Sequence, residues 1–257
     1  FIAQGSILAI ASILVRVMGM IYRIPMTAII GDKGNGFYSY AYSVYTILLL
    51  LSSYSLPLAV SKMVSAKAQL GQWRNVKRVF ICAIAFAIGI GTTFGLIVLI
   101  GAQFFTRVFF HSELAAIALR FMAPTILIMA LLGVFRGFFQ GLQNTLPTAV
   151  SQIVEGLINA IMSVVFAYFL FDFGHGMDVA SGTTDLGYAW GAAGGAIGTG
   201  AGALAGLIFC FILFVAYRKI LAVNISRDKT GTQQEYGDIF RLMLSIALPV
   251  ILSTALY

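Results

Sequence analysis

The chain has 257 residues, of which 60% are hydrophobic and only 10% are charged, and its mean hydropathy is +0.96. Soluble domains are roughly half apolar and about a quarter charged, so this composition excludes an ordinary soluble globular protein and indicates a membrane protein. The formal net charge of +7 does not indicate nucleic-acid binding, because the basic residues are spread over short connections between apolar runs, where they set membrane topology.

Seven apolar segments follow one another along the chain. Each complete segment is long enough to cross about 30 Å of hydrocarbon as a helix, and the short alternating segments of a membrane β-barrel are absent from the sequence. We therefore predict an all-α polytopic membrane protein. The expected segments are Ile2–Ile30, Phe37–Val64, Val79–Gly101, Ala115–Phe139, Thr148–Phe171, Tyr188–Tyr217 and a last one from Ile239 onward.

The two ends of the sequence indicate a piece of a longer protein. The chain starts at Phe1 without an initiator Met, and it ends inside the apolar run LMLSIALPVILSTALY. We expect residues 1–236 to form an N-terminal lobe of six transmembrane helices. Residues 237–257 are then expected to start a seventh helix that leads into a second lobe.

Charged residues in the connections predict the orientation. The fifth connection, DFGHGMDVASGTTDLG, contains three aspartates and neither Lys nor Arg, whereas the second and sixth are basic. Their basic residues are Lys62, Lys67, Arg74, Lys77 and Arg78 in the second and Arg218, Lys219, Arg227 and Lys229 in the sixth. Because Lys and Arg accumulate in cytoplasmic loops, we predict that the N-terminus and the second, fourth and sixth connections are cytoplasmic. Arg107 and Arg120 flank the third connection on the outer side and depart from this pattern.

The sixth segment contains a glycine at every fourth position of WGAAGGAIGTGAGALAG. Gly194, Gly198, Gly202 and Gly206 share one helix face, which allows the backbone of a neighbouring helix to approach closely. Gly200, Gly202 and Gly206 of the same stretch loosely match a dinucleotide-binding loop, but no strand precedes them and no acidic residue follows about twenty positions later. Helix packing is therefore the favoured interpretation.

The first segment carries two arginines at membrane depth. Arg16 lies roughly 20 Å along the helix from Phe1, and Ser12, Arg16, Gly19 and Arg23 share one face because their spacing is i, i+4, i+7, i+11. An arginine at such depth is costly unless it faces a wet cavity or a partner, which makes this stripe a candidate binding surface. The alternative is that each arginine extends toward one membrane surface and anchors the helix.

A second polar stripe runs along the fifth segment, where Gln152, Glu155, Asn159 and Ser163 share one face. Polar groups cannot face lipid without leaving hydrogen bonds unmade, so this stripe faces protein or water. It either joins helices by hydrogen bonds or lines a cavity, and Glu155 is placed to pair with Arg136 at the end of the fourth segment. Arg136 itself is either a cytoplasmic anchor or a cavity residue.

Enzymatic chemistry has little support in the sequence. His111 and His175 fall in outer connections without the clustered ligands that a metal site needs, and no serine has an identifiable His and Asp around it. We predict no catalytic residue, no metal and no cofactor. Tyr38, Tyr42 and Tyr45 share a face of the second segment and form either an interfacial aromatic belt or the wall of a ligand site.

Three stretches resemble a known family. FRGFFQGLQNTLPTAVSQIVEGLI, at 135–158, resembles the RG-x-x-QG-x-x-N-x-x-PTAVSQ-x-x-E signature of the stage V sporulation protein B and YtgP-like branch of the multidrug/oligosaccharidyl-lipid/polysaccharide (MOP) exporter superfamily. IIGDKGNGFYSYAYSVYTILL and GAAGGAIGTGAGALAGL are similar to two further stretches of that branch. The resemblance implies a two-lobed transporter that moves a polyprenyl-pyrophosphate-linked sugar across the membrane by alternating access.

The resemblance also implies a binding site. The lipid II flippases of this superfamily place essential cations on the first helix, and their R-V-x-G pattern is matched by Arg16, Val17, Met18 and Gly19, whereas Arg23 comes one residue later than the family's second arginine. The expected partner is the pyrophosphate head group of a lipid-linked oligosaccharide, most of all lipid II, and a coupling ion, sodium or proton, would act through the second lobe. The expected substrate-binding residues are Arg16, Arg23, Arg136, Gln152, Glu155 and Asn159.

Three other functions compete with this one. A cation-coupled multidrug exporter of the same superfamily would use carboxylates to bind cationic drugs, yet Glu155 is the one acid expected inside the membrane. A membrane-embedded transferase acting on lipid-linked sugars would need acidic chemistry at the membrane surface, for which the aspartates of DFGHGMDVASGTTDLG are the candidates. A scaffold for envelope or spore-coat assembly would tolerate the loss of Arg16.

Overall fold

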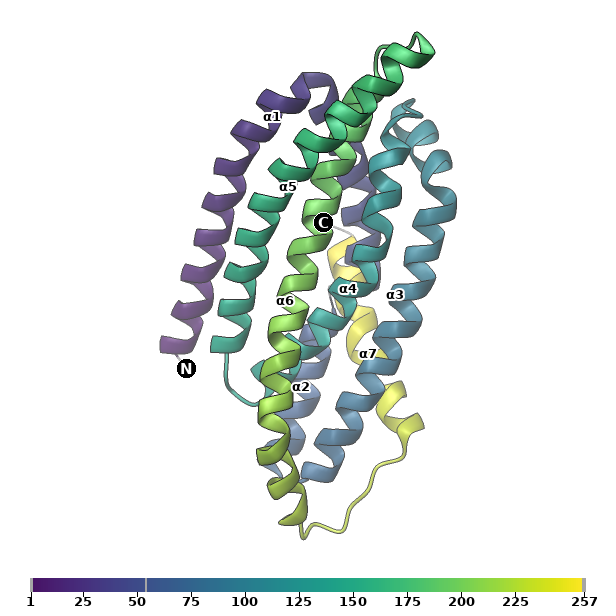
Figure 1. The fold of residues 1–257 in the computed structure, drawn as a ribbon. Helices are drawn as coiled ribbons and strands as arrows, with labels where there is room; N and C mark the ends of the chain where they lie inside the picture. Colours follow the sequence, from purple (N-terminus) through teal and green to yellow (C-terminus); the bar gives the residue numbers. More distant parts are fainter. Residues whose placement is uncertain (1, 54, 256–257) are drawn as a thin grey trace.

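The computed structural model describes residues 2–53 and 55–255, with side chains over 5–53 and 55–249, and this part of the chain is a bundle of long helices with no strand (Figure 1). The predicted all-α fold is confirmed. The helices are α1 (Ile2–Ser52), α2 (Leu56–Gln69), α3 (Trp73–Phe110), α4 (Ala115–Gly141), α5 (Leu146–Ser181), α6 (Leu186–Ser226) and α7 (Tyr236–Ala255). Within the described residues, five helical stretches are long and apolar enough to cross a membrane, and the first of them, Gly5–Gln69, turns back on itself.

The reversal in α1 takes place at Gly31. Its backbone has φ 63° and ψ −176°, a combination that is essentially restricted to glycine because a side chain would clash with the backbone. Figure 1 shows the first arm of α1 rising from the N-terminus and the second arm returning beside α4 and α6. The first predicted segment and most of the second are these two arms.

The second predicted segment, Phe37–Val64, is not one continuous helix. The structure ends α1 at Ser52 and starts α2 at Leu56. In an unbroken helix Pro57 would have to donate an N–H to the Ser53 carbonyl, but proline has no N–H and its ring would clash with that carbonyl. The Leu56 N–H bonds the Ser53 carbonyl instead, at 3.2 Å. The prediction was wrong here because it assumed that the helix continues through Pro57 with no more than a kink.

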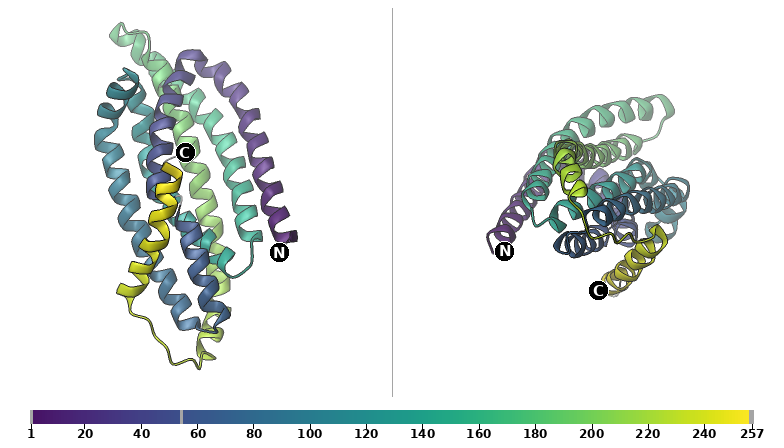
Figure 2. Two further views of the ribbon diagram at one scale, coloured as in Figure 1. Left: turned by 180° about the vertical axis from the view of Figure 1, so that it is seen from behind. Right: turned by 90° about the horizontal axis from the view of Figure 1, so that it is seen from below.

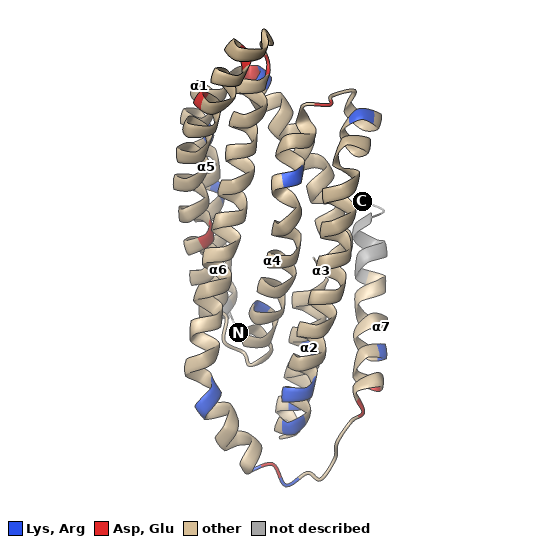
Figure 3. Ribbon diagram, turned by 45° about the vertical axis from the view of Figure 1, so that its right-hand side comes forward, with Lys and Arg blue, Asp and Glu red and all other residues tan. Residues whose placement is uncertain are grey.

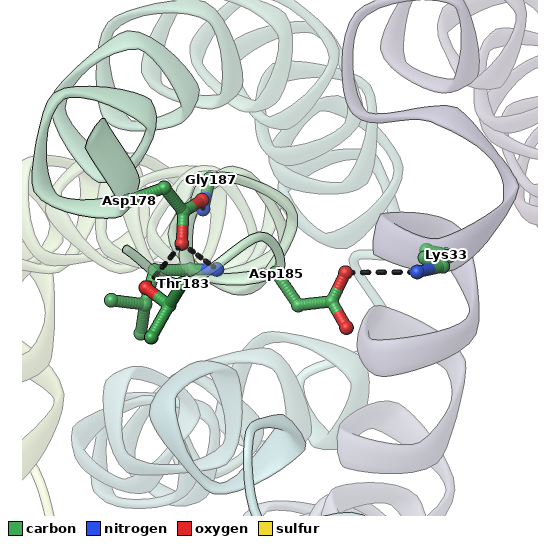
Figure 4. Close-up of polar contacts among 6 residues, drawn as sticks. Lys33, Asp178, Thr183, Asp185 and Gly187 are labelled. Atoms are coloured by element: carbon green, nitrogen blue, oxygen red, sulfur yellow. Dashed lines mark hydrogen bonds and ion pairs between the residues drawn. The ribbon is translucent and has the colours of Figure 1, made fainter. Parts of the chain in front are cut away.

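A carboxylate near the end of α5 holds the start of α6 at the turn between the two helices. Asp178 accepts hydrogen bonds from the backbone N–H groups of Leu186 and Gly187, at 3.0 and 2.8 Å, and from the Thr183 hydroxyl at 2.7 Å (Figure 4). These two N–H groups begin α6 and have no partner within their own helix, so a negative side chain there stabilises the helix start. Lys33, beside the reversal of α1, adds an ion pair with Asp185 at 2.9 Å.

The glycine stripe of α6 packs directly on α5, as predicted. A Cβ atom added at Gly194 would overlap the backbone at Phe166 and Ala167, and one at Gly198 would overlap the backbone of Ser163. At Gly202 the added atom would lie 2.6 Å from the Glu155 carbonyl oxygen. The two helices therefore touch along their backbones, in the manner of small-residue interfaces in membrane proteins.

Charge is distributed unevenly between the two ends of the bundle. Figure 3 shows Lys and Arg gathered where α2 ends, where α3 begins and where α6 meets its connection, whereas acidic residues are prominent at the opposite end, near the α5–α6 turn. This arrangement fits the predicted placement of the basic connections on one side of the membrane. The orientation itself stays a prediction from the distribution of Lys and Arg.

The connection between α6 and α7 is fastened to the start of α3. Asp228 accepts hydrogen bonds from the Arg74 N–H at 2.9 Å and from the N–H and hydroxyl of Thr230 at 2.9 and 2.6 Å. The Asn75 side chain donates to the Thr232 carbonyl at 3.1 Å and accepts from the Gln234 N–H at 3.0 Å. The pKa of Asp228 is lowered to about 2, chiefly because the backbone N–H of Arg74 stabilises the ionised carboxylate.

A second cation holds the other end of this connection. The guanidinium of Arg78 donates to the Gln234 carbonyl and to the Gln233 side chain, the latter at 2.8 Å, and lies 5.1 Å from the ring centre of Tyr236. Tyr236 is the first residue of α7, which lies on the outside of the bundle beside α2 and α3 (Figure 2). The chain therefore enters α7 from a fixed position.

Replacing Gly198 with Ala should destabilise the bundle. The added methyl group has no room against the Ser163 backbone, and overpacking of this kind costs about 1–3 kcal/mol, so we expect the midpoint of thermal unfolding to fall by roughly 5 °C or more. The matched control is Gly176→Ala in α5, where no heavy atom lies within 4 Å of an added Cβ. Equal melting temperatures for the two variants would contradict backbone contact between α5 and α6.

Asp228 should protect specific amides in a pH-dependent way. Its pKa is depressed on folding, so its stabilisation is complete above its unfolded value of about 3.9 and is lost as the pH falls through about 2. The protection factors of the Arg74 and Thr230 amides against hydrogen exchange should therefore fall severalfold as the pH is lowered from about 4 to about 2. Asp228→Asn should show the fast exchange at neutral pH, whereas Asp172→Asn, at an exposed aspartate of α5, should change neither amide.

Candidate functional site

The structure distributes the predicted site residues over three helices and separates them into three environments. One environment is the open side of α1, the second is an ion pair between α4 and α5 at a cavity that α1 and α2 also line, and the third is the α5–α6 interface. The residues in these environments are, in turn, Arg16 and Arg23; Arg136, Gln152 and Glu155; and Asn159.

The arginines of α1 lie on a strip between the side of the helix that packs on α5 and the side that exposes apolar residues. Val15 and Met18 contact the helix face of α5 at Gly156. Exposed apolar side chains, among them Met20 at 64% and Ile24 at 74%, lie on the other side of α1. Arg16 and Arg23 are both exposed, and neither has a hydrogen bond or ion pair with any described residue. Two guanidinium groups are therefore available to a ligand along one strip of a membrane helix.

Arg136 on α4 is held by two side chains of α5. Its Nη2 atom lies 2.7 Å from Glu155 Oε2, and its Nε donates to the Ser151 hydroxyl at 2.9 Å. The Arg136 side chain is 11% exposed and the Glu155 side chain 25% exposed, so the pair is largely shielded from solvent. The pairing considered from the sequence is present. It explains how two charges are accommodated in so apolar a bundle, because each charge satisfies the other.

A cavity of about 350 Å³ opens next to this ion pair. Its wall combines the guanidinium of Arg136 with the polar side chains of Ser53, Gln140, Thr148 and Gln152, and apolar residues complete it. The Gln140 amide donates to the Thr148 hydroxyl at 3.4 Å. The Gln152 Oε1 atom is buried and has no hydrogen-bond partner among the described residues. A polar ligand in this cavity would therefore meet a cation, amides and hydroxyls.

Asn159 lies in a different environment from the rest of the predicted stripe. It accepts a hydrogen bond from the Ser163 hydroxyl at 2.8 Å, and that hydroxyl also lies 3.3 Å from the Gly195 carbonyl of α6. An atom added at Gly202 would lie 2.7 Å from the Asn159 Cβ. Asn159 is thus part of the close contact between α5 and α6, which is one of the two alternatives left open by the sequence.

Further polar residues lie near these groups, and among them Thr125, Gln140 and Thr148 were not identified from the sequence as site residues. Tyr38 is 3% exposed, and its hydroxyl lies 3.3 Å from the Thr199 hydroxyl of α6. Tyr45 is also 3% exposed, so both tyrosines pack inside the bundle, whereas Tyr42 is 39% exposed. The buried hydroxyl of Thr125 has no partner among the described residues. For the cavity residues Gln140 and Thr148 a signal existed, since both fall within the QG-x-x-N-x-x-PTAVSQ stretch that contains Gln152.

Comparisons with known sequences identify the family. A family model described as polysaccharide biosynthesis protein matches residues 1–256. Stage V sporulation protein B of Bacillus subtilis (strain 168) is 26% identical over 253 residues, covering 97% of this chain and 45% of that protein. Lipid II flippase MurJ of the same organism is 25% identical over 254 residues, covering 95% of this chain and 45% of that protein. The chain thus spans about half the length of the curated relatives it matches.

Solved structures show the same fold. A MOP superfamily transporter from Pyrococcus furiosus superposes with a TM-score of 0.69 at 17% identity, over 97% of this chain and 52% of the other. An outward-facing multidrug resistance MATE family transporter of the MOP superfamily has a TM-score of 0.69 at 16% identity, again over 97% of this chain and 52% of the other. The chain is therefore a multi-pass membrane protein with the helical fold of half a MOP transporter, and it belongs to the polysaccharide biosynthesis protein family.

Proposed function

We propose that the protein containing this chain is a flippase that translocates a polyprenyl-pyrophosphate-linked saccharide, with lipid II as the favoured substrate. The observation that carries the proposal is that the guanidinium groups of Arg16 and Arg23, along one strip of α1, are exposed and have no hydrogen bond or ion pair with any described residue. Arginines at membrane depth are costly without a partner, so their retention is explained by an anionic ligand that binds there.

The sign of the charge distinguishes the substrate classes. Among the described residues expected at membrane depth, the three cations Arg16, Arg23 and Arg136 are balanced by one acid, Glu155, and that carboxylate is already paired with Arg136. An excess of cations favours an anion such as pyrophosphate, whose oxygens accept the planar fork of donors that arginine presents. A multidrug exporter for cationic compounds would instead need unpaired carboxylates inside the bundle.

The names of the relatives support the same substrate class. One relative is named as a lipid II flippase, and the family description is polysaccharide biosynthesis. In this proposal the protein makes and breaks no covalent bond.

The geometry suggests how the head group is carried. Arg16 binds the pyrophosphate with two parallel hydrogen bonds and Arg23 adds a second cation, while the polyprenyl tail stays in the bilayer. Gln152 and Arg136 offer further polar contacts at the cavity, and Glu155 balances the charge of Arg136. Asn159 supports the site through the α5–α6 contact. Alternating access requires the remainder of the protein, which meets this bundle beyond α7.

Replacing Arg16 with Ala in the full-length protein should abolish translocation without lowering its abundance in the membrane. Because Arg16 makes no hydrogen bond or ion pair with any described residue, we expect the fold not to depend on its charge, whereas the head group loses its main cation. The measurement is lipid II exposed on the outer leaflet of bacteria depleted of their own lipid II flippase. We expect rescue by the wild type and a loss of at least about tenfold in the variant, which corresponds to about 1.4 kcal/mol.

The matched control is Arg107→Ala, which removes an exposed arginine from α3 whose ion pair with Glu113 is 3.6 Å long. This variant should rescue as well as the wild type. An active Arg16→Ala protein would contradict the assigned role of Arg16. Failure of the wild type to rescue, with the protein present in the membrane, would redirect the substrate to another polyprenyl-linked glycan or to drug export.

A further inference from the structure

The ion pair between Arg136 and Glu155 leaves the neighbouring cavity without a net charge. Glu155 holds the guanidinium of Arg136 at 2.7 Å, and the pair is largely shielded from solvent. The other polar groups of the cavity wall are amides and hydroxyls. An anion that entered the cavity would approach Glu155 as well as Arg136, and like charges repel strongly at short range in a shielded place. The balance of charge therefore favours a neutral polar ligand in this cavity.

The cavity wall presents hydrogen-bond donors and an acceptor together. Of the five N–H donors of its guanidinium, Arg136 uses one for Glu155 and one for Ser151, which leaves three. Gln152 has the opposite chemistry, because its Oε1 atom is a buried acceptor that receives no hydrogen bond from any described residue. A buried acceptor without a donor costs free energy, so a ligand that donates a hydrogen bond to Gln152 is favoured.

Hydroxyl groups satisfy both residues, whereas phosphate oxygens do not. A hydroxyl donates one hydrogen bond and accepts up to two, so the hydroxyls of a sugar can donate to Gln152 and accept from Arg136. An ionised phosphate only accepts, and it would leave Gln152 Oε1 facing a second acceptor. Leu49, Pro57 and Met129 add apolar surface to the same wall, against which the C–H groups of a sugar ring can pack. The wall therefore has the chemistry of a saccharide site.

The cavity lies close to the depth of Arg16. Val15 and Met18 pack against Gly156 of α5, so Arg16, the residue after Val15, lies at the depth of Gly156. Gln152 is four residues before Gly156, which places it on the same face of α5 and about 6 Å away along the helix axis. One face of α5 thus meets α1 at Gly156 and the cavity at Gln152. A group bonded directly to a pyrophosphate on Arg16 would therefore reach the cavity.

We propose that this cavity binds the first sugar of the substrate, the one bonded directly to the pyrophosphate, with Gln152 accepting a hydrogen bond from a sugar hydroxyl and Arg136 donating to one. This inference rests on the proposed function, in which Arg16 holds the pyrophosphate, and adds to it a separate position for the sugar. The cavity volume of about 350 Å³ is near the lower end of the range of about 300–1,000 Å³ for ligand pockets, which fits a single sugar unit rather than a whole oligosaccharide.

The test compares two ligands that differ only in the sugar. One is farnesyl pyrophosphate, and the other carries one N-acetylglucosamine on its terminal phosphate. Binding of both is measured with the full-length protein in lipid nanodiscs, which keep sugar-containing detergents away from the cavity. The sugar should raise the affinity of the wild type by at least about tenfold, because it forms hydrogen bonds with groups that otherwise lack partners. Equal affinities for the two ligands would overturn the inference.

Gln152→Met removes the amide and keeps the length of the side chain. This variant should retain less than about threefold of the gain from the sugar and should bind farnesyl pyrophosphate like the wild type. Because Gln152 Oε1 has no hydrogen bond to any described residue, the midpoint of thermal unfolding should not fall. Gln103→Met, the same substitution at an exposed position of α3, should keep the full gain.

Gln140→Met provides a second variant, because it removes the other amide of the cavity wall. It should also reduce the gain from the sugar. Retention of the full gain in Gln152→Met, or in Gln140→Met if the first variant does not fold, would contradict the sugar site.

Arg16→Ala, measured with the same two ligands, separates this inference from the proposed function. It should weaken both ligands by a similar factor of at least about tenfold and leave the ratio of their affinities unchanged. If Arg16→Ala weakens both ligands but the sugar adds nothing in the wild type, the proposed function is retained and the sugar site is overturned. If Arg16→Ala binds both ligands like the wild type while Gln152→Met loses the gain, the sugar site is retained and the assigned role of Arg16 is overturned.

An octyl glycoside of the same sugar distinguishes a site for the substrate from a site for glycolipids in general. This ligand lacks the pyrophosphate, so it should bind at least about tenfold more weakly than the pyrophosphate-linked sugar, whose two parts are held by two linked positions. Equal affinities would assign the cavity to glycolipids and overturn the inference.

Discussion

The contact between the backbones of α5 and α6 determines where the other polar groups of the bundle lie. In a membrane the hydrophobic effect does not drive helices together, so close packing of small residues has to do so. The glycines of α6 bring that helix against Ser163, Asn159 and the backbone at Glu155. Once α5 is fixed in this way, its remaining faces are directed at α1 and α4, and Glu155 meets Arg136. The glycine stripe, which has no chemistry of its own, therefore positions the charged groups.

The three arginines of the predicted site differ in whether their charge is balanced within the structure. Arg136 is shielded and paired, and the free energy of its charge is balanced within the structure. Arg16 and Arg23 are exposed and have no partner among the described residues, so their charge is balanced only by solvent or by a ligand. An anion that enters the site would thus encounter cations that are free on α1 and a cation that is occupied on α4. In the proposed site, this difference would make an anion meet Arg16 and Arg23 before Arg136, an order that three equivalent arginines would not impose.

The sequence was sufficient for the helical architecture because apolar length and glycine spacing are local signals. Apolar runs of membrane length predicted the helices, and the four-residue glycine period predicted the face of α6 that packs on α5. The interruption between Ser52 and Leu56 was missed, since a proline inside an apolar run is compatible with a kink as well as with a break. The composition of the cavity was also beyond prediction, because Ser53, Gln140 and Gln152 become neighbours only when α4 and α5 pack beside the connection between α1 and α2. For the same reason the sequence could not separate Asn159, which bonds within the α5–α6 contact, from Glu155, which lies one turn away.

The connection from α6 to α7 is held against the bundle along much of its length. Here Asp228, Asn75 and Arg78 clamp it to the first turns of α3, and a chain fixed at successive points cannot act as a loose tether. The direction in which α7 leaves the connection is therefore inherited from α3. If a second lobe follows α7, as the proposed transporter requires, its movement against this bundle has to be taken up within or beyond α7, where Pro249 lies inside the helix and removes a backbone hydrogen bond. The start of α7 therefore stays in place relative to α3, and α7 can change direction only farther along its length.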